Sequence, residues 1–466
     1  MKNINVFKAV SNLTIMTEVK IGCEFHIQLN TKTKIFCSCS TSSSEEPNMN
    51  TCPTCLGLPG SKPAFNKEAL NQALKVALAL NCKINKRSYF SRKSYFYPDL
   101  PKNYQITQYE TPIATEGKLE GIRIKRVHLE EDPGKLMHQG AITLVDYNRS
   151  GIPLIEVVTE PDFKSPNEVR LFLRKLTTIL EYLKVYHRKS ELSIRTDANV
   201  SINNGERVEI KNITGVKPVE DALEYEIKRQ EKEKKIVRET RGYDADKNIT
   251  YTLRTKETEE DYGYIYDPDL PEFSLTDEML KEIKGRLPEL ASERAIRIIK
   301  QYKISKEDAE VLTQELKLAE LFEAIAKEIS PILAAKWLRR DLARVLHYNK
   351  KELHDVELEE SHLKELLKLV EERKITDQVA GKILEKLIEK PFSPKEYVER
   401  EKLIKITSTE DLRKLCLEAI AENLKAVEDY KKGEEKALDF VVGSVMKKTR
   451  GKADPVLVKE LIKKEI

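Results

Sequence analysis

Apolar and polar residues alternate in three short segments of the N-terminal half of the chain. Residues 122–129 alternate in this way just before Pro133 and Gly134, and a period of two followed by turn residues predicts a half-buried strand and a turn. Residues 20–28 and 193–201 repeat the period. Because alternate residues of a strand point to one face, the polar positions of these three strands predict one polar face on a shared sheet.

Two helices are predicted between these strands. Residues 66–79 carry apolar side chains near helical spacing, and Asn66 is a candidate N-cap. Residues 165–183 begin with Ser165-Pro-Asn-Glu168, which supplies a cap, a first-turn proline and a capping-box glutamate. Strands that outnumber helices and are joined by short turns predict an antiparallel α+β domain rather than a βαβ array.

The chain changes character at about Thr276 and becomes rich in Leu, Lys, Glu and Ala with helical periodicity. This second half is predicted to be all-α. Breaks occur at Ser330-Pro331 and Lys432-Gly433, and the prolines at 391 and 394 predict a domain linker. We therefore expect an N-terminal extension (1–17), an α+β domain (18–290), a helical domain (291–393) and a tail domain (394–466).

Composition narrows the class of protein. With 466 residues, 40% of them hydrophobic and 34% charged, the chain has the length of two to four globular domains at roughly 100–200 residues each. A net charge of +4 is too balanced to indicate nucleic-acid binding, so a basic surface would be local, as at residues 447–452. No apolar run approaches the ~20 residues of a membrane span, and no secretory signal begins the chain. We expect a cytoplasmic protein without membrane contact.

Four of the seven cysteines fall in one short segment. A C-x-C pair is followed, after twelve residues, by a C-x-x-C pair, and four thiolates on two tight loops suit a tetrahedral structural zinc. Disulfides are not expected in a cytosolic chain, whereas reduced cysteines without metal are the alternative. The expected ligands are Cys37, Cys39, Cys52 and Cys55.

Oxygen ligands are unusually dense after His128, where Glu130, Glu131 and Asp132 are consecutive. Three adjacent acids are also typical of a surface turn, which is the alternative. Two other strands repeat the chemistry, however, with polar residues at alternate positions. Hard divalent cations with nucleotide phosphates fit such a face, and because no glycine-rich phosphate loop is present, ATP would be held by metal and side chains. The repeated positions are Glu24, His26, Gln28, Arg195, Asp197 and Asn199.

Several motifs together resemble the B subunit of the aminoacyl-tRNA amidotransferase. The resemblance runs from about residue 18 to the end of the chain, and its combination of motifs is highly specific. The segments that carry it are Cys23–Gln28, the cysteine segment ending in Cys55-Leu-Gly-Leu-Pro-Gly60, Arg92–Gln105, His128–Asp132, Asp146–Pro153, Val208–Asn212 and Phe440–Lys447.

The resemblance implies a fold and an activity. Members have an antiparallel-sheet catalytic cradle that resembles glutamine synthetase, then an all-α helical domain and a tail that meets the tRNA. They convert Asp-tRNA(Asn) or Glu-tRNA(Gln) to Asn-tRNA(Asn) or Gln-tRNA(Gln), using ATP and Mg²⁺ to phosphorylate the side-chain carboxylate. Ammonia made from glutamine by an amidase A subunit displaces the phosphate, and a small C subunit joins A and B. Zinc would be structural.

The resemblance also suggests roles for individual residues. Four residues would hold the metal ions and take part in catalysis, with Asp197 as a weaker metal ligand. Five more would position nucleotide or substrate; the alternatives are core packing for Tyr97 and, for Arg149, a salt bridge that holds the turn at 146–148. The metal-binding set is Glu24, His26, Glu130 and Glu131, and the positioning set is Lys93, Tyr97, Arg149, Arg195 and Lys211, of which Lys211 is also a catalytic candidate.

The chain departs from the family pattern at Gly263, where members commonly have an arginine. The missing positive charge would come from another residue, such as Arg241 or Arg254. Which of the two misacylated tRNAs is the physiological substrate is not fixed by the residues.

Two rival functions also follow from parts of the sequence. One is an ATP-dependent ligase that acts on a free amino acid, although a small substrate needs no long helical tail. The other is a non-enzymatic, zinc-containing RNA adaptor, which the three polar strands disfavour. ATP hydrolysis that depends on misacylated tRNA, on free glutamate or on neither would separate the three functions.

Overall fold

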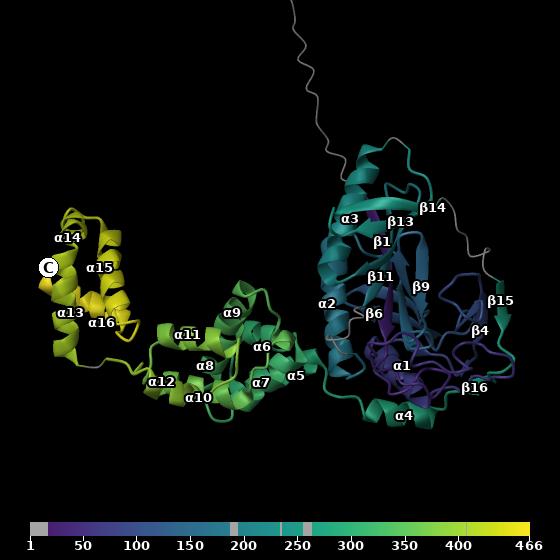
Figure 1. Cartoon of the computed structure of the whole chain (residues 1–466), viewed down its shortest axis with the longest axis horizontal. Helices are drawn as coiled ribbons and strands as arrows, with labels where there is room; N and C mark the ends of the chain where they lie inside the picture. Colours follow the sequence, from purple (N-terminus) through teal and green to yellow (C-terminus); the bar gives the residue numbers. More distant parts are fainter. Residues whose placement is uncertain (1–16, 187–193, 234, 255–262, 407) are drawn as a thin grey trace, which may run out of the picture. The chain divides into compact units, whose positions relative to one another are not determined.

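The computed structural model describes residues 17–186, 194–233, 235–254, 263–406 and 408–466. The chain divides into two compact units, residues 1–288 and residues 289–466. The described strands all lie in the first unit, whereas the second unit is built from helices (Figure 1). The predicted order of an α+β region followed by an all-α region is confirmed. None of the described helices has the length and apolar character needed to cross a membrane.

One large sheet organises the first unit. Its strands are β1 (Val19–Gln28), β2 (Lys83–Ile84), β4 (Ser91–Ser94), β5 (Tyr104–Thr107), β6 (Ala114–Leu119), β7 (Ile122–Glu131), β10 (Pro153–Thr159), β11 (Arg195–Ile202), β12 (Val208–Thr214), β13 (Glu239–Asp244), β14 (Ile249–Arg254) and β15 (Gly263–Tyr266). Two small sheets pair β3 (Arg87–Ser88) with β16 (Phe273–Ser274) and β8 (Lys135–Gln139) with β9 (Ile142–Asp146).

The strands of the large sheet follow the order β14-β13-β12-β11-β1-β10-β7-β5-β4-β15, and β6 pairs with β7 and β2. The described pairs are antiparallel, except that β12 and β13 run parallel. The predicted antiparallel sheet is therefore confirmed, with one parallel pair near its edge. The three strands predicted to share a face are β1, β7 and β11, and β10 lies between β1 and β7.

Among the described residues of the first unit, the α-helices are α1 (Lys67–Ala79), α2 (Pro166–Tyr182), α3 (Val216–Lys232) and α4 (Asp277–Gly285). The predicted caps are confirmed, since Asn66 Oδ1 accepts from the Glu68 amide at 2.9 Å and Ser165 Oγ accepts from the Glu168 amide at 3.3 Å. The Glu168 carboxylate reaches back to the amide of Lys164, one residue before the cap. Both helices thus begin where local side chains satisfy their first free amides.

The apolar face of the sheet packs against α1, α2 and α3 and forms the core, and α4 packs on α1. On β1 the buried residues Ile21, Phe25 and Ile27 alternate with polar ones, and Phe25 stacks on Phe172 of α2 with ring centroids 5.4 Å apart. Helix α3 packs on β11 and β12 (Figure 1). Burying such side chains contributes about 1.5–3 kcal/mol each, and it fixes the polar residues of the same strands on the opposite face.

The second unit contains two hydrophobic clusters of helices. The predicted breaks at Ser330-Pro331 and Lys432-Gly433 both fall between helices. The elements of the first cluster are α5 (Ala291–Tyr302), α6 (Lys306–Leu312), α7 (Leu316–Ile325), α8 (Pro331–Lys336), the π-helical η2 (Trp337–Leu342), α9 (Ala343–Tyr348), the 3-10 turn η3 (Leu353–Asp355), α10 (Glu360–Glu371), α11 (Asp377–Leu387) and α12 (Pro394–Arg400). Those of the second are α13 (Thr409–Glu422), α14 (Leu424–Lys431), α15 (Glu435–Lys448) and α16 (Pro455–Glu465).

The change from one helical cluster to the next does not fall at the predicted linker. Val398 of α12 is 2% exposed and belongs to the first cluster, and Tyr397 and Leu403 pack against this cluster. The second cluster begins only at Leu412. Ser393 caps α12 and Pro394 occupies its first turn. The proline that suggested a linker is therefore a helix start, and the packing changes only after Leu403.

Candidate functional site

Strands β1, β10 and β7 are neighbours, and their register determines which polar side chains meet. His26 of β1 lies opposite Glu156 of β10, which in turn lies opposite His128 of β7. Glu130 lies two residues beyond His128 and shares its face. The polar face expected from the alternation is therefore present on these strands.

His26, Glu130 and Glu156 form a candidate cation site on this face. One ligand atom from each lies within 4.8 Å of the others, and His26 Nε2 is 3.6 Å from a Glu156 oxygen and 4.0 Å from a Glu130 oxygen. Glu130 and Glu156 are only 5% and 7% exposed, so water screens their charge poorly. Two carboxylates and an imidazole are donors that suit a divalent cation.

Glu156 was missed at the level of sequence. It lies in the middle of β10, whose seven residues are all buried, and the surrounding apolar run predicts a plain core strand. A buried carboxylate is costly unless it is paired or coordinates a metal. A lone glutamate in an apolar strand was thus the signal that could have identified this residue.

His128 supplies positive charge next to the same carboxylates. It is 3% exposed, and its Nε2 lies 3.3 Å from Glu156 and 3.8 Å from Glu130. Burial alone would lower the pKa of His128, but the charges of Glu156 and Glu130 outweigh burial and raise this pKa to about 9. The same contact holds the pKa of Glu156 below its usual range despite burial. Glu156 is thus ionised and available as a ligand.

A second group of acids lies at the β1, β11 and β12 strands. Ligand oxygens of Glu24, Asp197 and Glu209 are within 4.8 Å of one another. Lys211 Nζ lies 3.0 Å from Asp197 and 2.9 Å from Glu209, and although burial opposes it, this lysine lowers the pKa of Asp197. Glu24 differs, because burial and then the repulsion of Glu156 raise its pKa to about 7. A cation near Glu24 would offset that repulsion.

Glu131 does not join the other predicted metal ligands. Its side chain points to the opposite face from Glu130, because successive residues of a strand alternate. There its carboxylate lies 2.5 Å from Lys102 Nζ and accepts from the Ile106 amide at 2.8 Å. Among the described residues, Glu131 is therefore not part of the group formed by His26, Glu130 and Glu156, and its assignment to metal stays a prediction.

Two predicted nucleotide-binding residues, Arg149 and Arg195, converge on Asp132, which is fully buried. Arg195 donates to Asp132 at 2.5 Å, and Arg149 Nε lies 3.7 Å from it. Arg149 also donates to the carbonyls of Pro133 at 2.9 Å and Gly134 at 2.6 Å. Arg149 thus braces the turn after β7 rather than the turn at 146–148.

The other positioning candidates have different surroundings. Lys93 pairs with Gln105 of β5. Gln105 lies on the same face of β5 as Thr107, two residues further on, and Thr107 donates to Glu130 at 3.3 Å. Lys93 therefore lies on the face of Glu130. Tyr97 is 54% exposed, which excludes core packing as its role.

Gly263 begins edge strand β15, and its neighbour Tyr264 pairs with Lys93. Arg241 does not supply the charge that the family arginine would carry, because it is 8% exposed and donates to Glu239 at 3.0 Å and to Thr250 at 2.9 Å. The side chain of Arg254 lies outside the described residues. Within the described part of the chain, the guanidinium of Arg241 is therefore already hydrogen-bonded to Glu239 and Thr250 and does not replace the family arginine.

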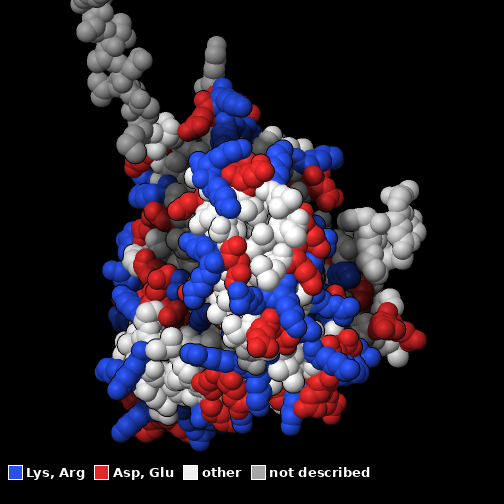
Figure 2. Space-filling view, turned by 90° about the vertical axis from the view of Figure 1, so that its left-hand side faces the viewer, with Lys and Arg blue, Asp and Glu red and all other residues white. Residues whose placement is uncertain are grey.

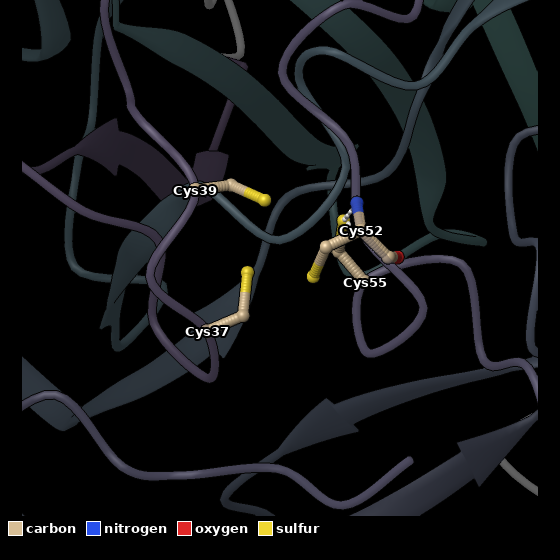
Figure 3. Close-up of side chains that lie close together, drawn as sticks. All are labelled: Cys37, Cys39, Cys52 and Cys55. Atoms are coloured by element: carbon tan, nitrogen blue, oxygen red, sulfur yellow. Dashed lines mark hydrogen bonds between the residues drawn. The ribbon is translucent and has the colours of Figure 1, made fainter. Parts of the chain in front are cut away.

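The four predicted zinc ligands come together in the structure. The sulfurs of Cys37, Cys39, Cys52 and Cys55 all lie within 4.8 Å of one another, on two facing loops (Figure 3). The Cys52 amide donates to Cys55 Sγ at 3.1 Å. A hydrogen bond from the Cys37 thiol lowers the pKa of Cys55 to about 5. Burial acts to raise this pKa, and the charge of Lys34 acts to lower it further. Four converging sulfurs fit a tetrahedral zinc.

Lys34 connects this cysteine cluster to the turn after β9. Its side chain is fully buried, and its ammonium donates to the carbonyls of Asn50 at 2.7 Å and Tyr147 at 3.2 Å and to Cys55 Sγ at 3.8 Å. All three of its donors are thereby used. A pocket lined by Lys34, Cys37 and Cys55 extends to Lys102 and Glu131, so the cluster adjoins the second face of β7.

The predicted basic turn at 447–452 joins α15 to α16. Lys448 is partly neutralised there, because its Nζ lies 2.7 Å from Glu422 and 3.4 Å from Glu418. On the face presented in Figure 2, basic and acidic side chains are interspersed rather than gathered by sign. On this face the mixture of charges matches the near balance of the composition.

Two family models match the sequence of this chain. Residues 19–281 match a family model described as the GatB/GatE catalytic domain, and residues 320–466 match one described as the GatB domain. The described strands and the candidate cation site fall within the first match.

Individual relatives are similar over almost their full length. The chain is 45% identical over 470 residues to the B subunit of an aspartyl/glutamyl-tRNA(Asn/Gln) amidotransferase from Caldanaerobacter subterraneus subsp. tengcongensis, covering 96% of this chain and 99% of the relative. Proteins of the same name are 43% identical in Carboxydothermus hydrogenoformans and 45% identical in Thermotoga petrophila, each covering at least 95% of this chain and 98% of the relative.

Proposed function

The chain belongs to the GatB family, and from this membership we propose that it is the B subunit of a tRNA-dependent amidotransferase. Its substrate is Asp-tRNA(Asn), Glu-tRNA(Gln) or both. The side-chain carboxylate is phosphorylated by ATP, and ammonia derived from glutamine then displaces the phosphate to leave an amide. The enzyme is thus a ligase that forms a carbon–nitrogen bond with glutamine as the amide donor.

The observation that carries this proposal is the buried group of His26, Glu130 and Glu156 on the polar sheet face. A carboxylate oxygen is a poor leaving group, so amidation at neutral pH requires prior activation. The chemistry that a bound Mg²⁺ supplies is neutralisation of charge on phosphate oxygens. The carboxylates of Glu130 and Glu156 are nearly excluded from water. Electrostatic stabilisation is strongest in such a water-poor environment.

Residues of the chain then have distinct roles. His128 keeps Glu156 ionised through their 3.3 Å contact. Glu24 and Asp197 offer further oxygen ligands, and Lys211 spans Asp197 and Glu209 and sets the charge of that group. Arg195 orders Asp132 at the end of β7.

We assign partners and domains on the same basis. The amidase A subunit supplies ammonia, a small C subunit joins A and B, and the complex is cytoplasmic. Residues 18–290 form the catalytic cradle, with a structural zinc on its four cysteines. A helical domain and a tail domain that contacts tRNA follow the cradle. The two separate hydrophobic clusters of the helical unit support this division, with the packing boundary after Leu403.

ATP cleavage by the complex of this chain with its A and C subunits tests the proposal. We expect cleavage that requires misacylated tRNA and does not respond to free glutamate. Dependence on free glutamate would instead indicate a ligase for the amino acid, and the absence of cleavage with any acceptor would indicate an RNA adaptor.

A second measurement concerns the source of ammonia. The purified chain alone is expected not to hydrolyse glutamine, whereas its complex supplied with ammonium chloride should still amidate the tRNA. Strong glutaminase activity of the chain by itself would contradict its assignment to this role.

A further inference from the structure

Arg126 also lies on the polar sheet face. It precedes His128 by two residues and Glu130 by four on β7, so the three side chains project to one side. Its partner across the sheet is Val158 of β10, and Val158 pairs in turn with Glu24 of β1. Arg126 therefore shares a face with residues of both acidic groups.

Two stacked tyrosines hold the guanidinium of Arg126. Its Cζ lies 5.7 Å from the ring centroid of Tyr109, and Tyr109 stacks on Tyr264 with centroids 4.0 Å apart and an interplanar angle of 18°. Tyr264 belongs to edge strand β15. Residues from distant parts of the sheet thus position one cation, since a guanidinium is attracted to the face of an aromatic ring.

Not all of the hydrogen-bonding groups of Arg126 are used within the described part of the chain. Its Nε is buried without a hydrogen-bond partner. No carboxylate of the described residues forms an ion pair with its guanidinium, although its charge helps to lower the pKa of Glu156. Arg149 and Arg195 differ, because both engage Asp132. A buried donor without a partner is costly, and on a face rich in carboxylates an unpaired arginine points to a ligand of its own.

We propose that Arg126 binds an oxyanion of the reacting groups, either the phosphoryl group of ATP or the carboxylate that receives it. This inference rests on the proposed function. In the transfer the bond between the γ-phosphorus and the ADP oxygen breaks, and a bond from phosphorus to a carboxylate oxygen forms. Arg126 keeps its protons throughout and complements the negative charge through its planar fork of donors.

The test compares Arg126→Gln and Arg126→Ala with the control Lys125→Gln in the assembled complex. Lys125 is exposed and is the unpaired residue where the register of β7 against β10 shifts, so the control removes the same charge from the adjacent position. We expect both Arg126 variants to lower tRNA-dependent ATP cleavage at least tenfold, and Lys125→Gln to stay within twofold of the wild type. Free guanidinium at millimolar concentration should restore part of the activity of Arg126→Ala.

The kinetic constants identify the oxyanion. A higher KM for ATP would assign the phosphoryl group to Arg126, and a higher KM for misacylated tRNA would assign the carboxylate. Cleavage within twofold of the wild type, or a loss that comes with a lower melting temperature and no rescue by guanidinium, would overturn the role. A wild-type complex that cleaves no ATP with misacylated tRNA would instead overturn the proposed function, which separates the two failures.

Discussion

Glu130 and Glu131, two consecutive residues of β7, have different surroundings. Glu130 lies on the cation face beside His26, and Glu131 pairs with Lys102 on the other face. Both carboxylates are almost fully buried, but only Glu130 belongs to a group that could hold a metal ion among the described residues. Their mutants should therefore fail for different reasons.

Replacing Glu130 by Gln keeps the size of the side chain but removes one negative charge from the cation site. We expect tRNA-dependent ATP cleavage to fall at least tenfold, which corresponds to about 1.4 kcal/mol of lost transition-state stabilisation. Raising the magnesium concentration should rescue Glu130→Gln in part, because the fault is cation affinity. The measurement is ATP cleavage across a magnesium titration.

Glu131→Gln is the matched comparison. It breaks a buried pair with Lys102, so a lower melting temperature is expected, and added magnesium should not restore activity. Equal rescue of both variants would contradict the separation of the two glutamates onto opposite faces.

Much of the candidate site was predictable from residue spacing. The period of two in β1 correctly grouped Glu24 with His26, and the same rule, applied to β7, would have separated Glu130 from Glu131. Glu156 and Arg126 were missed for different reasons. Glu156 stands alone in an apolar strand, and only strand pairing brings it to the polar face. Arg126 follows the period of two that leads to His128 and Glu130, and only the folded structure shows that its Nε lacks a hydrogen-bond partner.

At the scale of elements, the cysteine loops show what spacing determines and what folding adds. The spacing of the four cysteines predicted that they meet, and they do. Lys34 could not be predicted, because its partners lie at Asn50, Cys55 and Tyr147. Contacts between such distant positions depend on how the loops pack.

Zinc content provides the direct test of the cysteine cluster. The purified chain should contain about one zinc ion, and Cys52→Ser should lower that content and the melting temperature together, because binding a structural metal contributes to folding. Metal analysis and thermal unfolding of both proteins measure this effect. Cys416→Ser, which alters a buried cysteine of the tail, is the control and should leave the zinc content unchanged. Protein purified without chelator that lacks zinc and melts normally would show that the thiols are merely packed.

Lys34→Met tests the connection between the cysteine loops and the turn at 146–150. The substitution keeps an unbranched side chain, one heavy atom shorter, but leaves the carbonyls of Asn50 and Tyr147 without their donor. We expect the free energy of unfolding to fall by on the order of 3 kcal/mol, and zinc to be lost at a lower chelator concentration. Denaturant unfolding and chelator titration would measure both effects. An unchanged unfolding midpoint would mean that Lys34 does not hold the loops.

At the scale of the whole chain, the two-part organisation was predictable because strand and helix periodicities differ so clearly. The packing boundary within the helical unit was not, since Pro394 begins a helix whose Val398 belongs to the preceding core. A proline marks the start of a helix and the end of a domain by the same local signal. Only tertiary packing separates these two cases.

Two truncations test both the boundary and the role of the tail. Ending the chain after Ile406 removes the second helical cluster but keeps α12, whereas ending it before Pro394 also removes Val398 from the first core. We expect the longer truncation product to melt at a higher temperature than the shorter one, while both raise the KM for misacylated tRNA and still bind ATP. Unchanged tRNA affinity over a range of salt concentrations would contradict a tail that contacts tRNA.

The central claim is that the polar face supports transfer of a phosphoryl group to the side-chain carboxylate of an aminoacyl-tRNA. The most direct measurement follows oxygen atoms, using misacylated tRNA whose side-chain carboxylate is enriched in a heavy oxygen isotope. When ammonia displaces phosphate from the activated side chain, one carboxylate oxygen leaves with the phosphate and the other remains in the amide. We therefore predict one heavy oxygen in the inorganic phosphate for each amide formed. Inorganic phosphate without heavy oxygen, at normal amide yield, would contradict the account.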